Sequence, residues 1–207
     1  MDSRAVRNEV LCSLAKRNLK YIPAAVSNRH VHLSPEHVEA LFGKGYELTM
    51  QKPLSQPGQF ACGETVEVSG PRGSIGNVRV LGPARGETQV EISVTDSFVL
   101  GIEPIIRCSG FLIETPGCSI RGPKGEIRIE RGVIVSIRHI HMSAEQAEAY
   151  GIKNNDFIRL KKTGGLRETV LEMVFVRSGT GHDLELHIDT DEANAALIKN
   201  GDLLEIV

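Results

Sequence analysis

One short pattern occurs twice in this chain and limits what the chain can fold into. Arg29–Ser34 reads Arg-His-Val-His-Leu-Ser, and Arg138–Ser143 reads Arg-His-Ile-His-Met-Ser, 109 residues later (139 minus 30). Four of the seven histidines therefore lie in two His-x-His pairs. On a strand, the imidazoles of such a pair point to the same side, with Cα atoms roughly 7 Å apart, and can close on one metal ion. The repeat predicts two similar halves and a metal site, expected to be binuclear.

Composition favours short strands and tight turns over long helices. The 207 residues include 21 glycines and no tryptophan, and aromatic residues are few. Glycine exceeds its usual share of about 7%. The net charge is −2, and acidic and basic residues are intermixed along the chain. This pattern argues against a nucleic-acid partner, because nucleic-acid binding requires a basic patch.

The cysteines and the apolar runs indicate the compartment. The four cysteines form no Cys-x-x-Cys pair, which favours free thiols in a reducing environment. No apolar run approaches the roughly 18 residues of a membrane span, and the first residues lack the apolar core of a secretory signal. We expect a cytoplasmic protein with no membrane partner.

The first residues predict an amphipathic helix over 2–18. Val6, Val10 and Leu14 are spaced by four, with Leu11 beside them, and define its expected apolar face. Further helices are expected after Ser34 and Ser143, which are suited to N-capping, and from Thr190 or Asp191 to about residue 200. Residues 45–63 show little periodicity and predict a loop or flap with a turn at Gln56-Pro57-Gly58.

Short alternating strands fill most of the remaining chain. Apolar residues alternate with polar ones at Val66/Val68, at Val78/Val80 and in a strand that runs from Val90 to Val94. They alternate again in the segments 157–161, 170–176, 184–188 and 203–207. The second His pair continues the alternating face of Val133, Val135 and Ile137. The fold class expected is mainly β, with two small antiparallel β-barrels capped by short α-helices and an N-terminal amphipathic helix.

His187 is the natural fifth ligand to add to His30, His32, His139 and His141. It lies on the polar parity of its strand, opposite to the flanking leucines. Glu91 also lies on the polar parity of its strand, although composition alone does not select it. Zinc suits imidazole and carboxylate ligands, and a catalytic zinc keeps one position open, whereas a structural zinc is closed and often held by cysteines. His37 is expected on a helix surface and His182 in a loop, with a substrate contact as the alternative for His182.

Phosphate is the anion that such a site suits. Each His pair runs into a predicted helix start, whose free N–H groups and dipole favour anions. Arg85, in a turn shortly before Glu91, carries a guanidinium that can bind phosphate bidentately. Taken singly, Arg85 is better explained as a solvated turn residue.

From about Val26 to the C-terminus, several motifs resemble one known family. They are Ser27–Ser34, Gln56–Gly58, Gly82–Arg85, Arg138–Met142 and Leu186–Asn194. Together they resemble the PduL-type phosphate propanoyltransferases, the phosphate acyltransferases of bacterial microcompartments that take part in propanediol degradation.

The resemblance implies two zinc ions and the residues that hold them. One ion would be held by His30, His32 and Glu91, and the other by His139, His141 and His187. It also implies that Arg85 binds phosphate as the catalytic residue, and that Gln56, Pro57 and Gly58 contact substrate from a flap at about 45–63.

The resemblance further implies a discontinuous architecture and an assembly. One barrel would comprise residues 21–28 and 137–207, the other residues 29–136, and residues 1–20 would form a separate N-terminal helix. A homodimer is expected. The helix would either direct the protein to microcompartment shell proteins or pack on its own barrel.

The implied reaction converts acyl-CoA and phosphate into acyl phosphate and coenzyme A. Propanoyl-CoA is the expected donor, with acetyl-CoA as the alternative, and phosphate would attack the thioester directly with help from zinc. Two other readings remain open: a binuclear metallohydrolase acting on phosphate esters, and a zinc-stabilised barrel without enzymatic activity.

Overall fold

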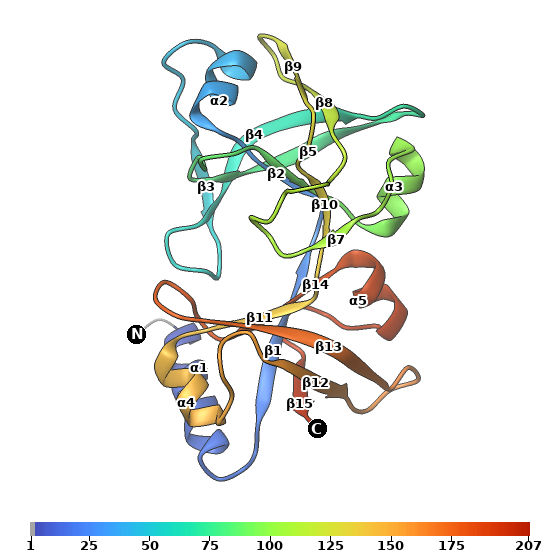
Figure 1. The fold of residues 1–207 in the computed structure, drawn as a ribbon. Coiled ribbons are helices and arrows are strands. Elements are labelled where there is room, and N and C mark those ends of the chain that lie inside the picture. The colour runs from blue at the N-terminus through green and yellow to red at the C-terminus, as the bar shows by residue number, and fades with distance from the viewer. Residues whose placement is uncertain (1–2) are drawn as a thin grey trace. The chain divides into compact units, whose positions relative to one another are not determined.

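The computed structural model describes residues 3–207, which form two compact units (Figure 1). One unit comprises the chain up to Ser27 together with Ile137–Val207, and the other comprises Asn28–Ser136. The predicted N-terminal helix was expected to begin at residue 2, which lies outside the described residues. None of the helices in the described part of the chain has the length and apolar character that a membrane crossing requires.

The first unit is built on a closed six-stranded barrel. Its strands follow the order β1-β14-β11-β13-β12-β15, and β15 pairs with β1 to close the ring. Their bounds are β1 (Tyr21–Ser27), β11 (His139–Met142), β12 (Phe157–Lys162), β13 (Thr169–Ser178), β14 (Glu185–Asp189) and β15 (Leu203–Ile206).

Three helices belong to this unit: α1 (Ser3–Ala15), α4 (Ala144–Tyr150) and α5 (Thr190–Ala196). Helices α1 and α4 lie side by side against the barrel (Figure 1). Ile140 and Leu186, from the two strands that carry histidines, are fully buried in the core. Tyr150 is also fully buried, and its hydroxyl donates to the carbonyl oxygen of Tyr21 at 2.6 Å.

The second unit is built on a sheet with its own core. The strand order is β7-β10-β6-β2-β5-β4-β8-β9, and β3 pairs with β4 beside this path. The strands are β2 (His30–His32), β3 (Met50–Pro53), β4 (Phe60–Ser69), β5 (Ser74–Gly82), β6 (Gln89–Glu91), β7 (Ile106–Arg107), β8 (Cys118–Arg121), β9 (Glu126–Ile129) and β10 (Val133–Ser136). Its helices are α2 (Pro35–Phe42) and α3 (Val94–Leu100).

The mainly β class with helical caps is confirmed, but the sheets are mixed rather than purely antiparallel. In the first unit, β1 pairs with β14 and β11 pairs with β13 in parallel. In the second unit, β2 pairs with β5 in parallel, and β10 pairs in parallel with both β6 and β7. Parallel neighbours need long connections, and these partners are separated in the sequence by other strands or helices. The alternation of apolar and polar residues along a strand is the same whether its neighbour is parallel or antiparallel, so the sequence pattern could not predict the strand directions.

The face that the N-terminal helix buries coincides only in part with the predicted one. Asn8, Leu11 and Ala15 are buried against the unit, whereas Val6 is 40% exposed and Val10 53% exposed. Asn8 turns inward because its side-chain amide donates to Asp183 Oδ1 at 2.6 Å. The hydrogen bond to Asp183 thus determines which face of the helix packs on the unit, and Val6 and Val10 remain on the surface.

Two further helix boundaries differ from prediction. Val94, expected to extend a strand, instead begins α3, because Ser93 forms a capping box with Asp96. Helix α5 ends at Leu197, whose φ of 52° is left-handed, and so stops before the expected end near residue 200. Elsewhere, α2 begins after Ser34 and α4 after Ser143, as the capping residues predicted.

We expect Gly117→Ala to destabilise the protein by about 1–3 kcal/mol, since overpacking has this cost. A β-carbon at Gly117 would collide with the carbonyl oxygen of Ile129 on the neighbouring strand, where the backbone cannot easily yield. Urea unfolding measures the change. The matched control is Gly76→Ala, whose β-carbon would meet nothing within 4 Å and should shift stability by less than about 1 kcal/mol. Equal losses in both variants would contradict the steric argument.

Candidate metal centres

In the second unit, His30, His32 and Glu91 form one cluster of donor atoms. Strand β2 carries both histidines, and β6 carries Glu91 directly opposite His30 in an antiparallel pair. His30 Nε2 lies 3.6 Å from Glu91 Oε1, and both residues are buried. One donor atom from each residue lies within 4.8 Å of the others, a spacing that one metal ion can bridge.

In the first unit, His139, His141 and His187 form a second cluster of the same size. His139 Nε2 and His141 Nε2 are 3.0 Å apart, and the ring centroids of His187 lie 5.2 and 4.8 Å from those of His139 and His141. Two nitrogens on one tetrahedral zinc, each about 2.0–2.1 Å from it, would lie about 3.3 Å apart. The imidazole pair is therefore close to the spacing a shared ion requires.

Both clusters are made by the same strand pairing. In the second unit, His30 lies opposite Glu91, and His32 lies opposite Gln89. The first unit repeats this arrangement, with His139 opposite His187 and His141 opposite Glu185. Because side chains alternate along a strand, an antiparallel pair of two such strands brings four polar side chains to one face. The duplication thus extends beyond the His pairs to the strands that face them.

Each of the four ligand strands also runs into a capped helix, with the N-cap two residues after the last ligand. The N-caps are Ser34 of α2, Ser93 of α3, Ser143 of α4 and Asp189 of α5. Each cap side chain accepts a hydrogen bond from the backbone N–H three residues on, which fixes the chain direction at the end of the strand. The metal-ligand positions are thereby anchored from the helix side.

The residue before each His pair is an arginine that forms an ion pair with an acidic residue. This acidic residue lies on the helix that follows the paired strand, the strand with the third residue of the cluster. Arg29 Nη2 contacts Asp96 Oδ1 of α3 at 2.8 Å, and Arg138 Nε contacts Glu192 Oε1 of α5 at 2.6 Å. Both acids occupy the third helical position, where they also accept the backbone N–H of the N-cap residue. Each ion pair therefore joins the two ligand strands of one cluster and holds their register.

Hydrogen bonds set which ring nitrogen is available in the first histidine of each pair. His30 Nδ1 bonds the carbonyl of Asn28 at 2.9 Å, and His139 Nδ1 bonds that of Ile137 at 2.7 Å. A carbonyl accepts only from a protonated nitrogen, so Nε2 carries the lone pair in both rings. His32 Nδ1 is buried without a hydrogen-bond partner among the described residues.

The surroundings of His32 and His141 favour the neutral form of these two imidazoles. Burial, with the neighbouring charges of His30 and Arg85, lowers the pKa of His32 to about 2. Burial and the nearby His139 likewise lower the pKa of His141 well below its ordinary value. Burial also lowers the pKa of His30, but the Glu91 carboxylate outweighs it and the net shift is upward. Neutral imidazole is the form that binds metal.

Arg85 is linked to the second-unit cluster by a short hydrogen-bond network. Its Nη1 donates to Ser109 Oγ at 3.3 Å, and Gln89 Nε2 donates both to Ser109 Oγ at 2.8 Å and to Glu91 Oε1 at 2.6 Å. The Gln89 carbonyl oxygen accepts from Gly110 N–H at 2.7 Å, which holds the loop that carries Ser109. The Arg85 guanidinium and the carboxylate of Glu91, a candidate metal ligand, therefore share one network.

The predicted flap contains regular structure. Strand β3 and the start of β4 lie within residues 45–63, and Gln56, Pro57 and Gly58 form the turn between them. Gln56 is buried, whereas Pro57 and Gly58 are exposed, and Gly58 has a φ of 75°. Their contact with substrate stays a prediction, as does the joining of the two clusters in one binuclear centre.

Sequence reasoning missed the polar residues beside the ligands. Glu185 is 7% exposed, and its Oε2 lies 3.1 Å from His187 Nε2. Gln89 is equally hidden and bonds Glu91. The sequence did contain a signal for these residues. Glu185 lies two residues before His187 and Gln89 two residues before Glu91, so each pair points to the same face of its strand. Ser109 lies in a loop, and no local pattern marks it.

We expect the protein to bind two divalent metal ions, and His30→Ala and His139→Ala each to retain one. Each substitution removes a ligand from one cluster and leaves the other cluster intact. Metal analysis after dialysis against excess zinc gives the stoichiometry, with circular dichroism to verify folding. His37→Ala is the control, because His37 Nδ1 bonds Thr88 Oγ1 rather than a member of either cluster. A wild-type stoichiometry in both ligand variants would show that these clusters are not the metal sites.

Comparison with known proteins identifies the family. A family model described as phosphate propanoyltransferase matches residues 23–199. The phosphate propanoyltransferase of Priestia megaterium is 55% identical over 207 residues, covering 98% of this chain and 95% of that protein. Those of Thermotoga maritima and Rhodopseudomonas palustris are 54% and 49% identical, covering 90% and 89% of this chain and 89% and 81% of those proteins. The resemblance inferred from the motifs is confirmed: the chain belongs to the phosphate propanoyltransferase family and is an acyltransferase.

Proposed function

We propose that the protein transfers the acyl group of acyl-CoA to phosphate, giving acyl phosphate and coenzyme A, with the help of two bound zinc ions. Family membership supports the acyl transfer to phosphate. Propanoyl-CoA is the proposed donor, because it corresponds to the names of the relatives. Acetyl-CoA is the alternative donor, since one methylene is worth only about 1–3 kcal/mol of discrimination.

One observation carries the proposal for the site. Arg85, Ser109, Gln89 and Glu91 form a continuous network, so a guanidinium and a candidate metal ligand are fixed relative to each other. Phosphate is strongly hydrated and a weak nucleophile, so it must be oriented before it can attack. An arginine that is itself held by a hydrogen bond can present a preformed fork to two phosphate oxygens.

The donor sets suit zinc. Two imidazoles with either a carboxylate or a third imidazole leave one position of a tetrahedral ion open, as catalytic zinc requires. We assign one ion to His30, His32 and Glu91 and the other to His139, His141 and His187. Zinc bound there would supply Lewis acidity for the developing oxyanion and positive charge for phosphate.

The reaction needs no acylated side chain. Arg85 binds phosphate and turns one of its oxygens toward the thioester carbonyl carbon. The new C–O bond forms as the C–S bond breaks, and coenzyme A leaves as a thiolate that takes up a proton from solvent. The turn at Gln56, Pro57 and Gly58 is proposed to cover the substrates. An acylated side chain trapped during turnover would rule out this direct attack.

We expect CoA release from propanoyl-CoA to depend on both phosphate and metal. Thiol release is followed with and without phosphate, before and after chelation, and after zinc is restored. Release without phosphate would instead support a hydrolase, and the absence of release under all conditions would remove the proposed function. The variant Arg85→Lys keeps the charge but loses the fork, so its KM for phosphate should rise roughly tenfold or more. Arg128→Lys, an exposed arginine on β9, is the matched control and should behave as wild type.

We also propose that the protein is a homodimer in the cytoplasm, housed in a bacterial microcompartment through contacts of α1 with shell proteins. The exposed Val6 and Val10 support this role, because they form an apolar stripe on the outer side of a helix that is anchored through its other face.

We expect the double substitution of Val6 and Val10 by Ser to abolish co-purification with shell proteins while acyl transfer stays unchanged. The exposed valines are not needed for packing on the barrel, so folding should be preserved. Met173→Ser, an equally exposed apolar residue on β13, serves as control. Retained shell association in the double variant would show that α1 acts only as part of the barrel.

A further inference from the structure

His182 lies directly against one ligand of the first-unit cluster. Its Nδ1 is 3.0 Å from His141 Nδ1, and the two ring centroids are 4.6 Å apart. It belongs to the turn between β13 and β14 and is not among the three residues whose donor atoms gather in that cluster. His182 therefore contacts a candidate ligand without itself completing the triad.

The atoms involved define what His182 can do. His141 points Nε2 at His139 Nε2, 3.0 Å away, so Nε2 is its cluster-facing atom. A ring that offers the Nε2 lone pair to a metal carries its proton on Nδ1. That Nδ1–H then donates to His182 Nδ1, which accepts. The contact selects both the tautomer and the ring orientation that metal binding needs, as outer partners of metal-bound histidines do.

The equivalent histidine of the second unit has no such partner. His32 occupies the same place in the repeat as His141, but its Nδ1 is buried and has no hydrogen-bond partner in the described part of the chain. His30 and His139, by contrast, are both oriented by a backbone carbonyl two residues earlier. The repeated motif alone thus accounts for the first histidine of each pair, and His182 is an addition specific to the first unit.

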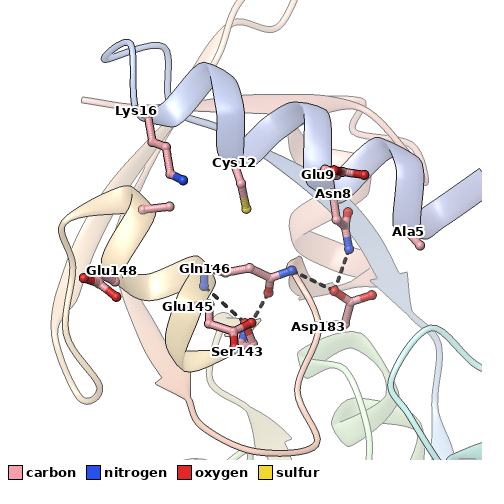
Figure 2. A pocket seen from close by; sticks show the side chains of 11 residues that line it. Ala5, Asn8, Glu9, Cys12, Lys16, Ser143, Glu145, Gln146, Glu148 and Asp183 are labelled. Atoms are coloured by element: carbon pink, nitrogen blue, oxygen red, sulfur yellow. Dashed lines mark hydrogen bonds between the residues drawn. The ribbon is translucent and has the colours of Figure 1, made fainter.

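A clamp on the next residue holds His182 in place. Gly179 and Gly181 precede it, and the φ of 75° at Gly181 is left-handed, so the turn has little conformational restraint of its own. Asp183 supplies the restraint. Its Oδ1 accepts from the amides of Asn8 on α1 at 2.6 Å and Gln146 on α4 at 2.9 Å, as Figure 2 shows, and from Leu184 N–H at 2.9 Å.

The clamp depends on the docking of α1. Leu11 and Ala15 bury one side of this helix, but a cavity of about 840 Å³ lies between α1 and α4, with Cys12 pointing into it (Figure 2). Direct packing of the two helices is therefore incomplete. The bond from Asn8 to Asp183 bridges α1 to the turn at the edge of this cavity, which makes α1 part of the support of His182.

We propose that His182 is a positioning residue for His141, and that the docked N-terminal helix holds it there through Asp183. The inference rests on the metal centre of the proposed function. It links the N-terminal helix to the affinity of one cluster for metal and leaves the other cluster unaffected.

The test measures metal binding to one unit at a time. In a His30→Ala background only the first-unit cluster remains, and in a His139→Ala background only the second-unit cluster remains. Metal-depleted proteins are titrated with Co²⁺, whose visible absorption reports ligand geometry, and a competing chelator gives the dissociation constant. The variants are His182→Ala, His182→Asn, Asn8→Ala and, as control in the same turn, the exposed Thr180→Ala.

In the His30→Ala background, His182→Ala should raise the dissociation constant roughly ten- to a hundredfold and shift the Co²⁺ spectrum, as loss of an outer partner typically does. His182→Asn should restore most of the affinity, because its Oδ1 occupies the place of Nδ1 and also accepts. Asn8→Ala should give a smaller loss in the same direction, and Thr180→Ala none. In the His139→Ala background all four should bind as the parent does.

Several results would overturn the inference. These are an unchanged first-unit affinity in His182→Ala, equal losses in His182→Ala and His182→Asn, or the same losses in the second-unit background. Unchanged binding in Asn8→Ala would remove the link to α1. Failure of the proposed function has a different signature: the wild-type protein would bind no Co²⁺ at the clusters or release no CoA with phosphate.

Discussion

The antiparallel pairing of a His-x-His strand with a strand that carries the third ligand is the constraint on which the rest depends. It places His30 opposite Glu91 in one unit and His139 opposite His187 in the other. A slip of one residue in either pair would turn the ligands to the opposite face. The capped helices and the ion pairs Arg29–Asp96 and Arg138–Glu192 all act on this register, since each fixes the chain just before or just after a ligand.

The two clusters are held in place by different kinds of neighbouring residues. The second-unit cluster is joined to Arg85 through Gln89 and Ser109, which lie in the same unit. The first-unit cluster has His182, which is held through Asp183 by the N-terminal helix. A loop and a terminal helix are among the least stable parts of most folds. The chain therefore links one cluster to Arg85, the proposed phosphate-binding residue, and the other cluster to the N-terminal helix.

Much of the fold could be predicted because its signals are local. Alternation predicted the main strands, and Ser34 and Ser143 marked the starts of two helices. Strand direction could not be predicted, because alternation is the same in parallel and antiparallel neighbours. The buried face of α1 was predicted only in part, for a related reason: Asp183, which binds Asn8, lies 175 positions away in the sequence. The residues of the two candidate metal clusters could be named from the repeat and the family resemblance. Gln89 and Glu185 became apparent only from the strand pairing, which places them beside those residues.

The carboxylate occupies different positions in the two clusters, and this difference has an electronic consequence. In the second unit, the acid is Glu91 itself and Gln89 is the neutral neighbour, whereas in the first unit His187 is the neutral ligand and Glu185 is the acid beside it. Direct carboxylate ligation cancels part of the charge of a divalent ion. A carboxylate one bond further out polarises the imidazole instead and leaves the ion the stronger electron-pair acceptor. Two ions of the same element would thus differ in electrophilicity. The ion in the cluster that contains His187 would be the stronger electrophile.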